Sequence, residues 1–367
     1  MDKIKSISVI GARPNFVKVA PIIKEMNKYN DIKHLLIHTG QHYNYEMSKI
    51  FFNDLDIPNP DFFLGVGSGS HAEQTATIMI EFEKVLVEEK PDLIIVVGDV
   101  NSTLACSIVA SKMLIPVAHV EAGLRSFDRT MPEEINRIVT DSLSDFLFTT
   151  CHDANKNLER EGIPKEKIHF VGNVMIDTLK NFLNKSENSK IRKKLKLLNE
   201  NYIILTLHRP SNVDNKSVFV SIIKALKDIQ KKIKIVFPAH PRTIKMINFF
   251  KLNNEFKKMK NFIFIEPLSY LDFLHLVKRS KFVMTDSGGI QEETTVLNIP
   301  CLTLRRNTER PITITEGSNI LVGNNYKKII EESFKILNGQ VKKAKIPELW
   351  DGKAAERIVT ILRNNLT

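Results

Sequence analysis

Apolar and mixed segments alternate along the chain in a regular way. Short runs of aliphatic and β-branched residues are separated by longer stretches, of helical length, that mix polar and apolar positions. A short run that is almost entirely apolar is typical of a strand buried on both faces. We predict six such strands in each half of the chain, at residues 7–10, 34–37, 93–97, 116–120, 146–149, 169–171, 202–205, 233–237, 262–265, 282–284, 301–304 and 320–322.

This alternation also predicts the domain organisation. Buried strands that are separated by helices form parallel sheets with helices on both faces. The chain is therefore predicted to be an α/β protein with two doubly wound domains, residues 1–171 and 172–350, that face a cleft. Residues 351–367 have a helical pattern, and we expect this tail to pack back on the N-terminal domain.

The composition narrows the class of protein. Of the 367 residues, 43% are hydrophobic and 26% are charged, which excludes a disordered or fibrous chain. No apolar run approaches the roughly 18 residues that span a bilayer, and residues 1–5 lack the apolar stretch of a signal peptide. Three cysteines that lie far apart form neither a disulfide framework nor a zinc motif. We expect a cytoplasmic protein with no membrane partner and no metal.

The net charge of +11 hides an asymmetry between the two halves. Residues 1–170 carry 18 Lys and Arg against 24 Asp and Glu, a net charge of −6, whereas residues 171–367 carry +17. This division favours a basic domain that holds an anion and an acidic domain that presents carboxylates. Nucleic-acid binding is the alternative, but it would need a basic stripe with stacking aromatics, and the lysines are dispersed. We therefore expect no nucleic-acid partner.

Candidate residues in the N-terminal half follow three predicted strands. Arg13 and Lys18 follow the first strand, near a helix N-terminus where anions bind well, and the segment is not a dinucleotide fingerprint. Asp99 and Glu121 stand at the ends of two later strands, and Glu133 lies in the first turn of a predicted helix. Each carboxylate by itself is also consistent with helix capping. Three that converge on one cleft favour general acid and base catalysis.

Candidate residues in the C-terminal half favour a phosphate and a ribose as ligands. His208 and His240 follow two consecutive strands, although a lone histidine is often structural. A further strand leads into a segment whose two glycines let backbone N–H groups approach a phosphate, and this segment comprises Ser287, Gly288 and Gly289. Glu293, one helical turn later, is suitably placed to accept hydrogen bonds from a ribose diol.

Two further residues complete this set. Arg310 offers a charge-assisted contact to the same anion. Phe273 offers an aromatic face for a base, although an aromatic residue at a helical position more often belongs to the core.

In its motifs the sequence resembles a known family along nearly its whole length. It is similar to the non-hydrolysing UDP-N-acetylglucosamine 2-epimerases, which have two Rossmann-like domains in the glycosyltransferase-B arrangement. The matching segments are Gly11-Ala12-Arg13-Pro14, Gly40-Gln41-His42, Gly98-Asp99, His119-Val120-Glu121-Ala122-Gly123-Leu124-Arg125, Pro132-Glu133-Glu134, His208-Arg209, Asp286-Ser287-Gly288-Gly289-Ile290-Gln291-Glu292-Glu293 and Thr308-Glu309-Arg310-Pro311.

The resemblance implies interconversion of UDP-GlcNAc and UDP-ManNAc. UDP is eliminated to give 2-acetamidoglucal and is then added back with the opposite configuration at C2. No cofactor or metal is needed. The resemblance implies an acid or base role for Asp99, Glu121 and Glu133, and contacts to the sugar and the departing pyrophosphate for Arg13, Lys18 and His208. It implies nucleotide binding for Ser287, Gly288, Gly289, Glu293 and Arg310. Phe273 would lie beside uracil.

The resemblance also implies partners. Some family members bind a second UDP-GlcNAc as an activator, and Gln41, Arg209 and His240 match positions that are used there. A homodimer is expected on the same ground.

The substrate has alternatives. Asn15, Pro210 and the segment 126–131 depart from the commonest bacterial pattern. Such variants also occur in relatives that act on UDP-2,3-diacetamido-glucuronic acid, whereas Thr308-Glu309-Arg310-Pro311 favours UDP-GlcNAc. A hydrolysing epimerase that releases ManNAc is a further alternative. A glycosyltransferase of the same fold is the other rival, because its donor-binding half would look alike.

Overall fold

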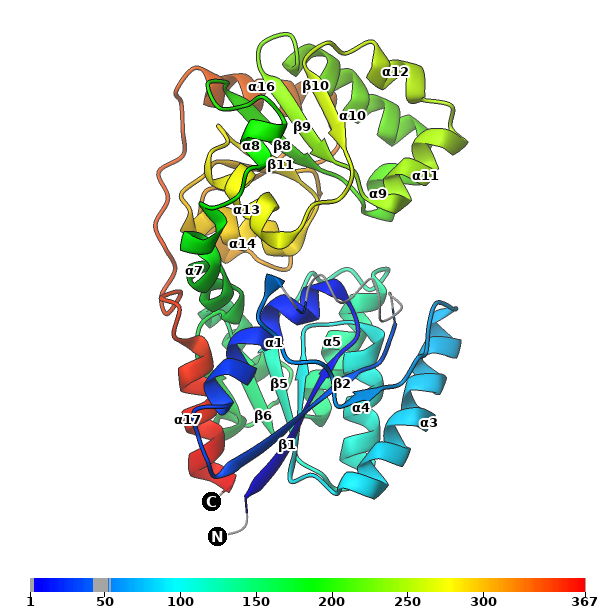
Figure 1. The fold of residues 1–367 in the computed structure, drawn as a ribbon, viewed down its shortest axis with the longest axis vertical. Coiled ribbons are helices and arrows are strands. Elements are labelled where there is room, and N and C mark those ends of the chain that lie inside the picture. The colour runs from blue at the N-terminus through cyan, green and yellow to red at the C-terminus, as the bar shows by residue number, and fades with distance from the viewer. Residues whose placement is uncertain (1–2, 42–51, 53, 367) are drawn as a thin grey trace. The chain divides into compact units, whose positions relative to one another are not determined.

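The chain forms two compact units (Figure 1). The computed structural model describes residues 3–41, 52 and 54–366, and for Arg13 it describes the backbone alone. The first unit comprises Met1–Asn181 and Glu348–Thr367, and the second comprises Phe182–Pro347. Helix α7 (Val174–Ser186) begins in the first unit and ends in the second.

The first unit is built on a parallel sheet that, over the described residues, has seven strands in the order β3-β2-β1-β4-β5-β6-β7. The strands are β1 (Ile4–Ile10), β2 (Ile32–His38), β3 (Phe62–Phe63), β4 (Leu93–Val97), β5 (Val117–Ala122), β6 (Phe146–Thr149) and β7 (Ile168–Phe170). Besides α7, its helices are α1 (Arg13–Met26), α3 (His71–Glu89), α4 (Asn101–Lys112), α5 (Pro132–Leu143), α6 (His152–Arg160), the 3-10 helix η1 (Lys165–Lys167) and α17 (Ala354–Leu366).

Strand β4 shows why the central strands are wholly apolar. Successive side chains of a strand point to opposite faces of the sheet. Ile94 and Val96 pack into the core beneath α3 and α4, whereas Ile95 and Val97 pack into the core that α17 completes on the other face. Because both faces are covered, every position of β4 is buried.

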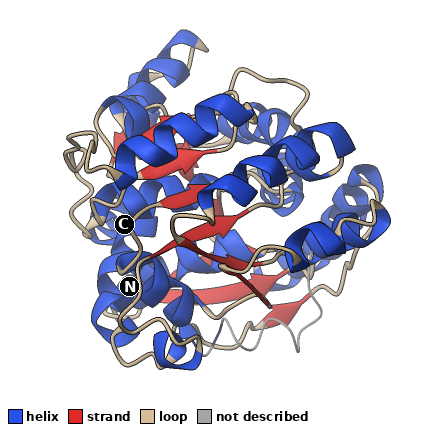
Figure 2. Ribbon diagram, turned by 90° about the horizontal axis from the view of Figure 1, so that it is seen from above, coloured by secondary structure: helices blue, strands red, loops and turns tan. Residues whose placement is uncertain are grey.

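The second unit, all of whose residues are described, has a six-stranded parallel sheet in the order β10-β9-β8-β11-β12-β13. The strands are β8 (Tyr202–Thr206), β9 (Lys234–Pro238), β10 (Phe262–Ile265), β11 (Val283–Thr285), β12 (Cys301–Thr303) and β13 (Asn319–Leu321). The helices are α8 (Ile191–Lys194), α9 (Pro210–Val213), α10 (Lys216–Ile229), α11 (Pro241–Phe249), α12 (Asn253–Lys257), α13 (Tyr270–Lys278), α14 (Gly288–Val296), α15 (Ile312–Thr315) and α16 (Tyr326–Leu337). Figure 2 shows strands in red and helices in blue.

The predicted fold class is confirmed: both sheets are parallel and doubly wound. The prediction missed one strand, β3, which has only two residues. Such a segment is too short to show a hydrophobic period. Within the described residues, no helix is both long enough and apolar enough to cross a membrane.

The C-terminal helix α17 packs beside α1 in the first unit (Figure 1). Its N-terminus is capped from another helix, because the carboxylate of Asp177 accepts hydrogen bonds from the backbone N–H groups of Ala354 (3.1 Å) and Ala355 (2.7 Å). Just before α17, the indole of the buried Trp350 donates to the carbonyl of Thr150 at 2.9 Å. These contacts fasten the returning chain to the first unit.

Asp177 makes the stability of this attachment depend on pH. Burial raises its pKa from 3.8 to about 6, against the opposing effect of the two backbone donors. Because the folded-state pKa is raised, the protonated carboxyl is favoured in the folded protein, and this preference is lost as the pH rises through about 6.

We therefore expect the free energy of unfolding of the natural protein, relative to D177N, to fall by up to about 3 kcal/mol between pH 4 and pH 7. Urea unfolding of both proteins, followed by circular dichroism across this range, measures the difference. Since all other groups titrate alike in the two proteins, the comparison isolates Asp177. A difference that stays constant or grows with pH would contradict this account.

Candidate active site

Polar side chains gather where β4 and β5 end. Asp99 follows β4 after Gly98, and Glu121 lies near the end of β5. The two strands are neighbours and run in parallel, so their carboxyl ends share one edge of the sheet. Ligands of open parallel sheets bind at this edge.

Lys18 of α1 and Glu121 form a buried ion pair, with 2.6 Å between Nζ and Oε2. Their side chains are only 6% and 2% exposed. Gly98 makes room for this pair, because a Cβ there would lie 2.6 Å from Lys18 Nζ. Removing either charged partner would leave the other charge buried and uncompensated, which is strongly destabilising.

The backbone at Glu121 is strained. Its φ is +74°, in the left-handed region that non-glycine residues seldom adopt, and the pairing of β5 with β6 shifts register between Val120 and Ala122. Strain of this kind clusters at functional sites, where the surrounding structure holds it in place. Here the irregular turn directs the carboxylate of Glu121 to Lys18.

Asp99 is held by Arg137 of α5, whose Nη1 donates to its carboxylate. The buried guanidinium also bonds Glu134, at 3.0 Å from Nε and 2.6 Å from Nη2. Burial raises the pKa of Glu134, but backbone N–H groups and Arg137 outweigh burial and lower it overall. Glu133, the neighbouring residue in the first turn of α5, is half-buried.

Neither Arg137 nor Glu134 is predicted from the sequence to act in the site. A signal was present, because a Glu and an Arg three positions apart on a helix lie on one face. The contact from Arg137 to Asp99, however, joins residues 38 positions apart and depends on how α5 packs.

A second buried network joins the ends of β4 and β5. The ring of His119 bridges Asp141, at 2.6 Å from Nδ1, and the carbonyl of Gly98, at 2.8 Å from Nε2. Arg125 pairs with the other oxygen of Asp141 at 2.7 Å. Burial raises the pKa of Asp141, but His119 and Arg125 outweigh burial and lower it. The network therefore fixes the backbone that carries Asp99 and Glu121.

The turn before α1 depends on Asn15. Its Oδ1 accepts from the backbone N–H groups of Gly11 (3.1 Å) and Ala12 (2.9 Å), and its Nδ2 donates to the carbonyl of Val97 (2.9 Å). This departure from the common bacterial pattern thus has a structural role that needs both a donor and an acceptor. The side chain of the predicted ligand Arg13 lies outside the described part of the chain.

In the second unit, the ends of β8 and β11 bring His208 and Asp286 together. Nδ1 of His208 lies 3.0 Å from Oδ1 of Asp286, which is fully buried. Burial raises the pKa of Asp286, but His208 and two backbone N–H groups outweigh it and hold the pKa at about 2. His240, after β9, places its ring centroid 5.3 Å from that of His208.

The start of α14 is packed against Arg310. A Cβ at Gly288 would lie 2.5 Å from Nη1 of Arg310, so a larger residue there would displace the guanidinium. The guanidinium is paired with two buried carboxylates, Glu292 and Glu309. Burial raises the pKa of Glu309, but Arg310 and Arg305 outweigh burial and hold it well below its usual value.

The remaining predicted residues of the second unit lie on adjacent elements. The hydroxyl of Tyr270 on α13 bonds Glu293 at 2.9 Å, and both side chains are buried. Burial, together with Glu293, raises the pKa of Tyr270 well above 10. Ser287 is the N-cap residue of α14, and Phe273 packs against the apolar core of the second unit.

The predicted activator residues are spread over both units. Gln41, in the first unit, is buried and accepts hydrogen bonds from the backbone N–H (3.0 Å) and hydroxyl (2.7 Å) of Ser102. In the second unit, Arg209 lies 3.9 Å from Glu309, and Nδ1 of His240 accepts from the N–H of Arg242.

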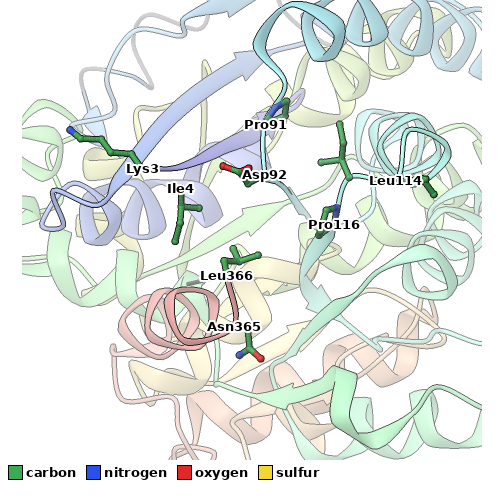
Figure 3. Close-up of a pocket in the computed structure, with 9 residues that line it drawn as sticks. Lys3, Ile4, Pro91, Asp92, Leu114, Pro116, Asn365 and Leu366 are labelled. Carbon is green, nitrogen blue, oxygen red and sulfur yellow. The ribbon is translucent and has the colours of Figure 1, made fainter. Parts of the chain in front are cut away.

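A surface pocket of about 580 Å³ lies away from these residues (Figure 3). It opens where β1, β4 and β5 begin, so it is at the opposite edge of the sheet from Asp99 and Glu121. Its lining includes Ile4, Asp92, Leu114, Pro116 and Leu366. Across the described residues, no group of three or more His, Cys, Asp or Glu side chains is arranged to hold a metal ion.

Comparison with known proteins identifies relatives that span nearly the whole chain. A Methanocaldococcus jannaschii UDP-N-acetylglucosamine 2-epimerase is 47% identical over 359 residues, which cover 96% of this chain and 97% of the relative. A Pseudomonas aeruginosa UDP-2,3-diacetamido-2,3-dideoxy-D-glucuronate 2-epimerase is 40% identical, over 90% of this chain and 91% of its own length.

The fold agrees with that of a solved relative. The crystal structure of the Methanocaldococcus jannaschii UDP-GlcNAc 2-epimerase in complex with UDP-GlcNAc and UDP superposes with a TM-score of 0.92 at 46% identity, over 98% of this chain and 99% of that one. The family model for UDP-N-acetylglucosamine 2-epimerase matches residues 24–363. The chain therefore belongs to the UDP-N-acetylglucosamine 2-epimerase family.

Proposed function

We propose that this chain interconverts UDP-GlcNAc and UDP-ManNAc by eliminating UDP and adding it back. The observation that carries the proposal is the buried Lys18–Glu121 pair, with Asp99 held by Arg137 at the same sheet edge. Acids and cations held rigidly at one strand edge suit a reaction that moves a proton and releases a diphosphate. Relatives that share the family and nearly the full length of the chain support the same reaction.

The chemistry explains the residue types. A base removes the C2 proton, the C–H electron pair forms the C1=C2 bond of 2-acetamidoglucal, and the C1–O bond breaks with its electrons on the departing UDP. In the return step, UDP attacks C1 and an acid delivers a proton to the opposite face of C2. We assign Asp99, Glu121 and Glu133 to this acid and base set, and Lys18, Arg13 and His208 to the sugar and the departing diphosphate.

The second unit would bind the nucleotide. Ser287, Gly288 and Gly289 begin α14, where the N-terminus of a helix favours a phosphate. Glu293, oriented by Tyr270, accepts from the ribose hydroxyls. Arg310, kept in place by its two carboxylates, lies against Gly288 and reinforces the positive end of the helix, and Phe273 lies beside uracil.

We also propose a homodimer in the cytoplasm that binds a second UDP-GlcNAc as activator. Gln41, Arg209 and His240 are its candidate ligands. The resemblance of their motifs to those of activated relatives supports this assignment.

UDP-2,3-diacetamido-glucuronate is the second candidate substrate. It is favoured by the Pseudomonas aeruginosa relative that is named for this substrate and is 40% identical. The protein is incubated with each UDP-sugar separately in deuterated buffer. The sugar that acquires deuterium at C2 is the substrate.

Replacing Glu121 by Gln should reduce turnover about 10²- to 10⁴-fold, because the amide cannot exchange a proton with C2. Although loss of the buried charge destabilises E121Q, the Kd of the folded variant for UDP should stay within about threefold of the natural value, since in this assignment Glu121 does not contact the nucleotide. Proton NMR of UDP-GlcNAc in deuterated buffer measures product and C2 exchange together. If the natural protein turns over without deuterium at C2, the elimination mechanism is wrong.

Replacing Glu293 by Ala should raise the Kd for UDP about tenfold or more, because two ribose hydroxyls lose a charged acceptor. Isothermal titration calorimetry measures the affinity directly. The matched control is E331A, on a solvated part of α16, which should bind UDP like the natural protein. Unchanged UDP affinity in E293A would remove Glu293 from the ribose site.

A further inference from the structure

The carboxylate of Asp286 accepts hydrogen bonds from several groups of the turn that follows β8. It accepts from the backbone N–H of His208 (3.0 Å), the backbone N–H of Arg209 (2.8 Å) and the side-chain amide of Asn212 (3.1 Å). The imidazole of His208 adds a fourth donor at 3.0 Å. The acid therefore binds both the ring of His208 and the backbone that carries it.

The ring of His208 has one nitrogen engaged and one exposed. Nδ1 faces Asp286, and Nε2 has no hydrogen-bond partner among the described residues. The side chain is 34% exposed, whereas the Asp286 side chain is inaccessible to solvent. A ligand at the end of β8 would thus meet Nε2.

A second His–Asp pair, in the described part of the first unit, shows what a purely structural pair looks like. His119 is fully buried, and both of its ring nitrogens are used inside the first unit, by Asp141 and by the carbonyl of Gly98. His119 cannot reach a substrate. The exposed Nε2 of His208 is the feature that distinguishes its pair with Asp286.

The charge on Asp286 determines what His208 can do. The ring and the N–H donors keep the pKa of this buried acid at about 2. The carboxylate is therefore ionised near neutral pH. An ionised acceptor that faces Nδ1 takes a hydrogen bond from that nitrogen and fixes the orientation of the ring. This orientation leaves the accessible Nε2 to face a ligand.

We propose that Asp286 is the positioning residue for His208: it holds the Nδ1–H and directs Nε2 to the departing diphosphate oxygen. With an anion facing each ring nitrogen of the bound complex, Nε2 carries a proton and donates it in a hydrogen bond to that oxygen. This inference rests on the proposed function, which places His208 at the diphosphate. When the C1–O bond breaks, the electron pair stays on that oxygen, and the Nε2–H bond strengthens as the negative charge develops. No proton needs to be transferred by His208 in this step.

The first test is D286N, which keeps an acceptor for the turn but removes the charge that faces Nδ1. The kcat should fall about 10²-fold while the KM for UDP-GlcNAc stays within about threefold, because the lost interaction strengthens only as the C1–O bond breaks. The matched control is N212A, which removes another donor to Asp286 but keeps the His208 contact, and its kcat should remain within about threefold of the natural value. An equal loss in N212A would mean that Asp286 only shapes the turn, and would overturn the proposal.

A double-mutant cycle with H208Q separates positioning from general stability. If Asp286 acts through His208, adding D286N to H208Q should lower kcat by less than about twofold, since the group that Asp286 orients is already gone. The same loss in both backgrounds would overturn the proposal.

The natural protein provides a test that does not depend on folding of D286N. Nitrogen-15 NMR of labelled histidine in the complex with UDP, with the His208 signals assigned by their absence in H208Q, should show protons on both ring nitrogens. An unprotonated Nδ1 would overturn the proposal. If instead the natural protein shows no C2 exchange with UDP-GlcNAc while these signals are as expected, the proposed function fails and the Asp286–His208 pairing stands.

Discussion

Burial of charge at the carboxyl ends of the strands is the constraint on which the candidate site depends. A carboxylate that is removed from water must meet a cation or several N–H donors, because an uncompensated buried charge costs several kcal/mol. Glu121 meets Lys18, Asp99 meets Arg137, and Asp286 meets the turn after β8. Since each partner comes from a different element, these pairs also fix separate elements of the fold against one another.

The same constraint shapes the backbone. Gly98 leaves the space that Lys18 Nζ occupies, and Glu121 accepts a left-handed conformation that costs about 1–3 kcal/mol so that its carboxylate reaches the cation. The bridge from His119 to the carbonyl of Gly98 keeps both strand ends in register. The result is a set of charged groups whose positions are settled before a substrate arrives, which is what electrostatic catalysis requires.

Much of the fold follows from the apolar pattern. The wholly apolar run of β4 predicted a strand with both faces covered, whereas the two residues of β3 carry no detectable period. The pattern also identified the residues after the strands as candidates, and Asp99, Glu121 and His208 stand at such ends in the structure. Partners such as Arg137 and Tyr270 escaped prediction, because they lie on helices whose packing faces the sequence does not specify.

The sequence by itself determined the two parallel sheets, the edges at which polar side chains gather and the family to which the chain belongs. Only the tertiary structure decided which charges pair and which histidine stays accessible. In the sequence, His119 lies within a predicted strand and His208 follows one. In the structure, both ring nitrogens of His119 are hydrogen-bonded in the interior, whereas Nε2 of His208 is accessible. The physical reason is that hydrogen-bond partners and burial come from segments far apart in sequence, such as Asp286, 78 positions beyond His208.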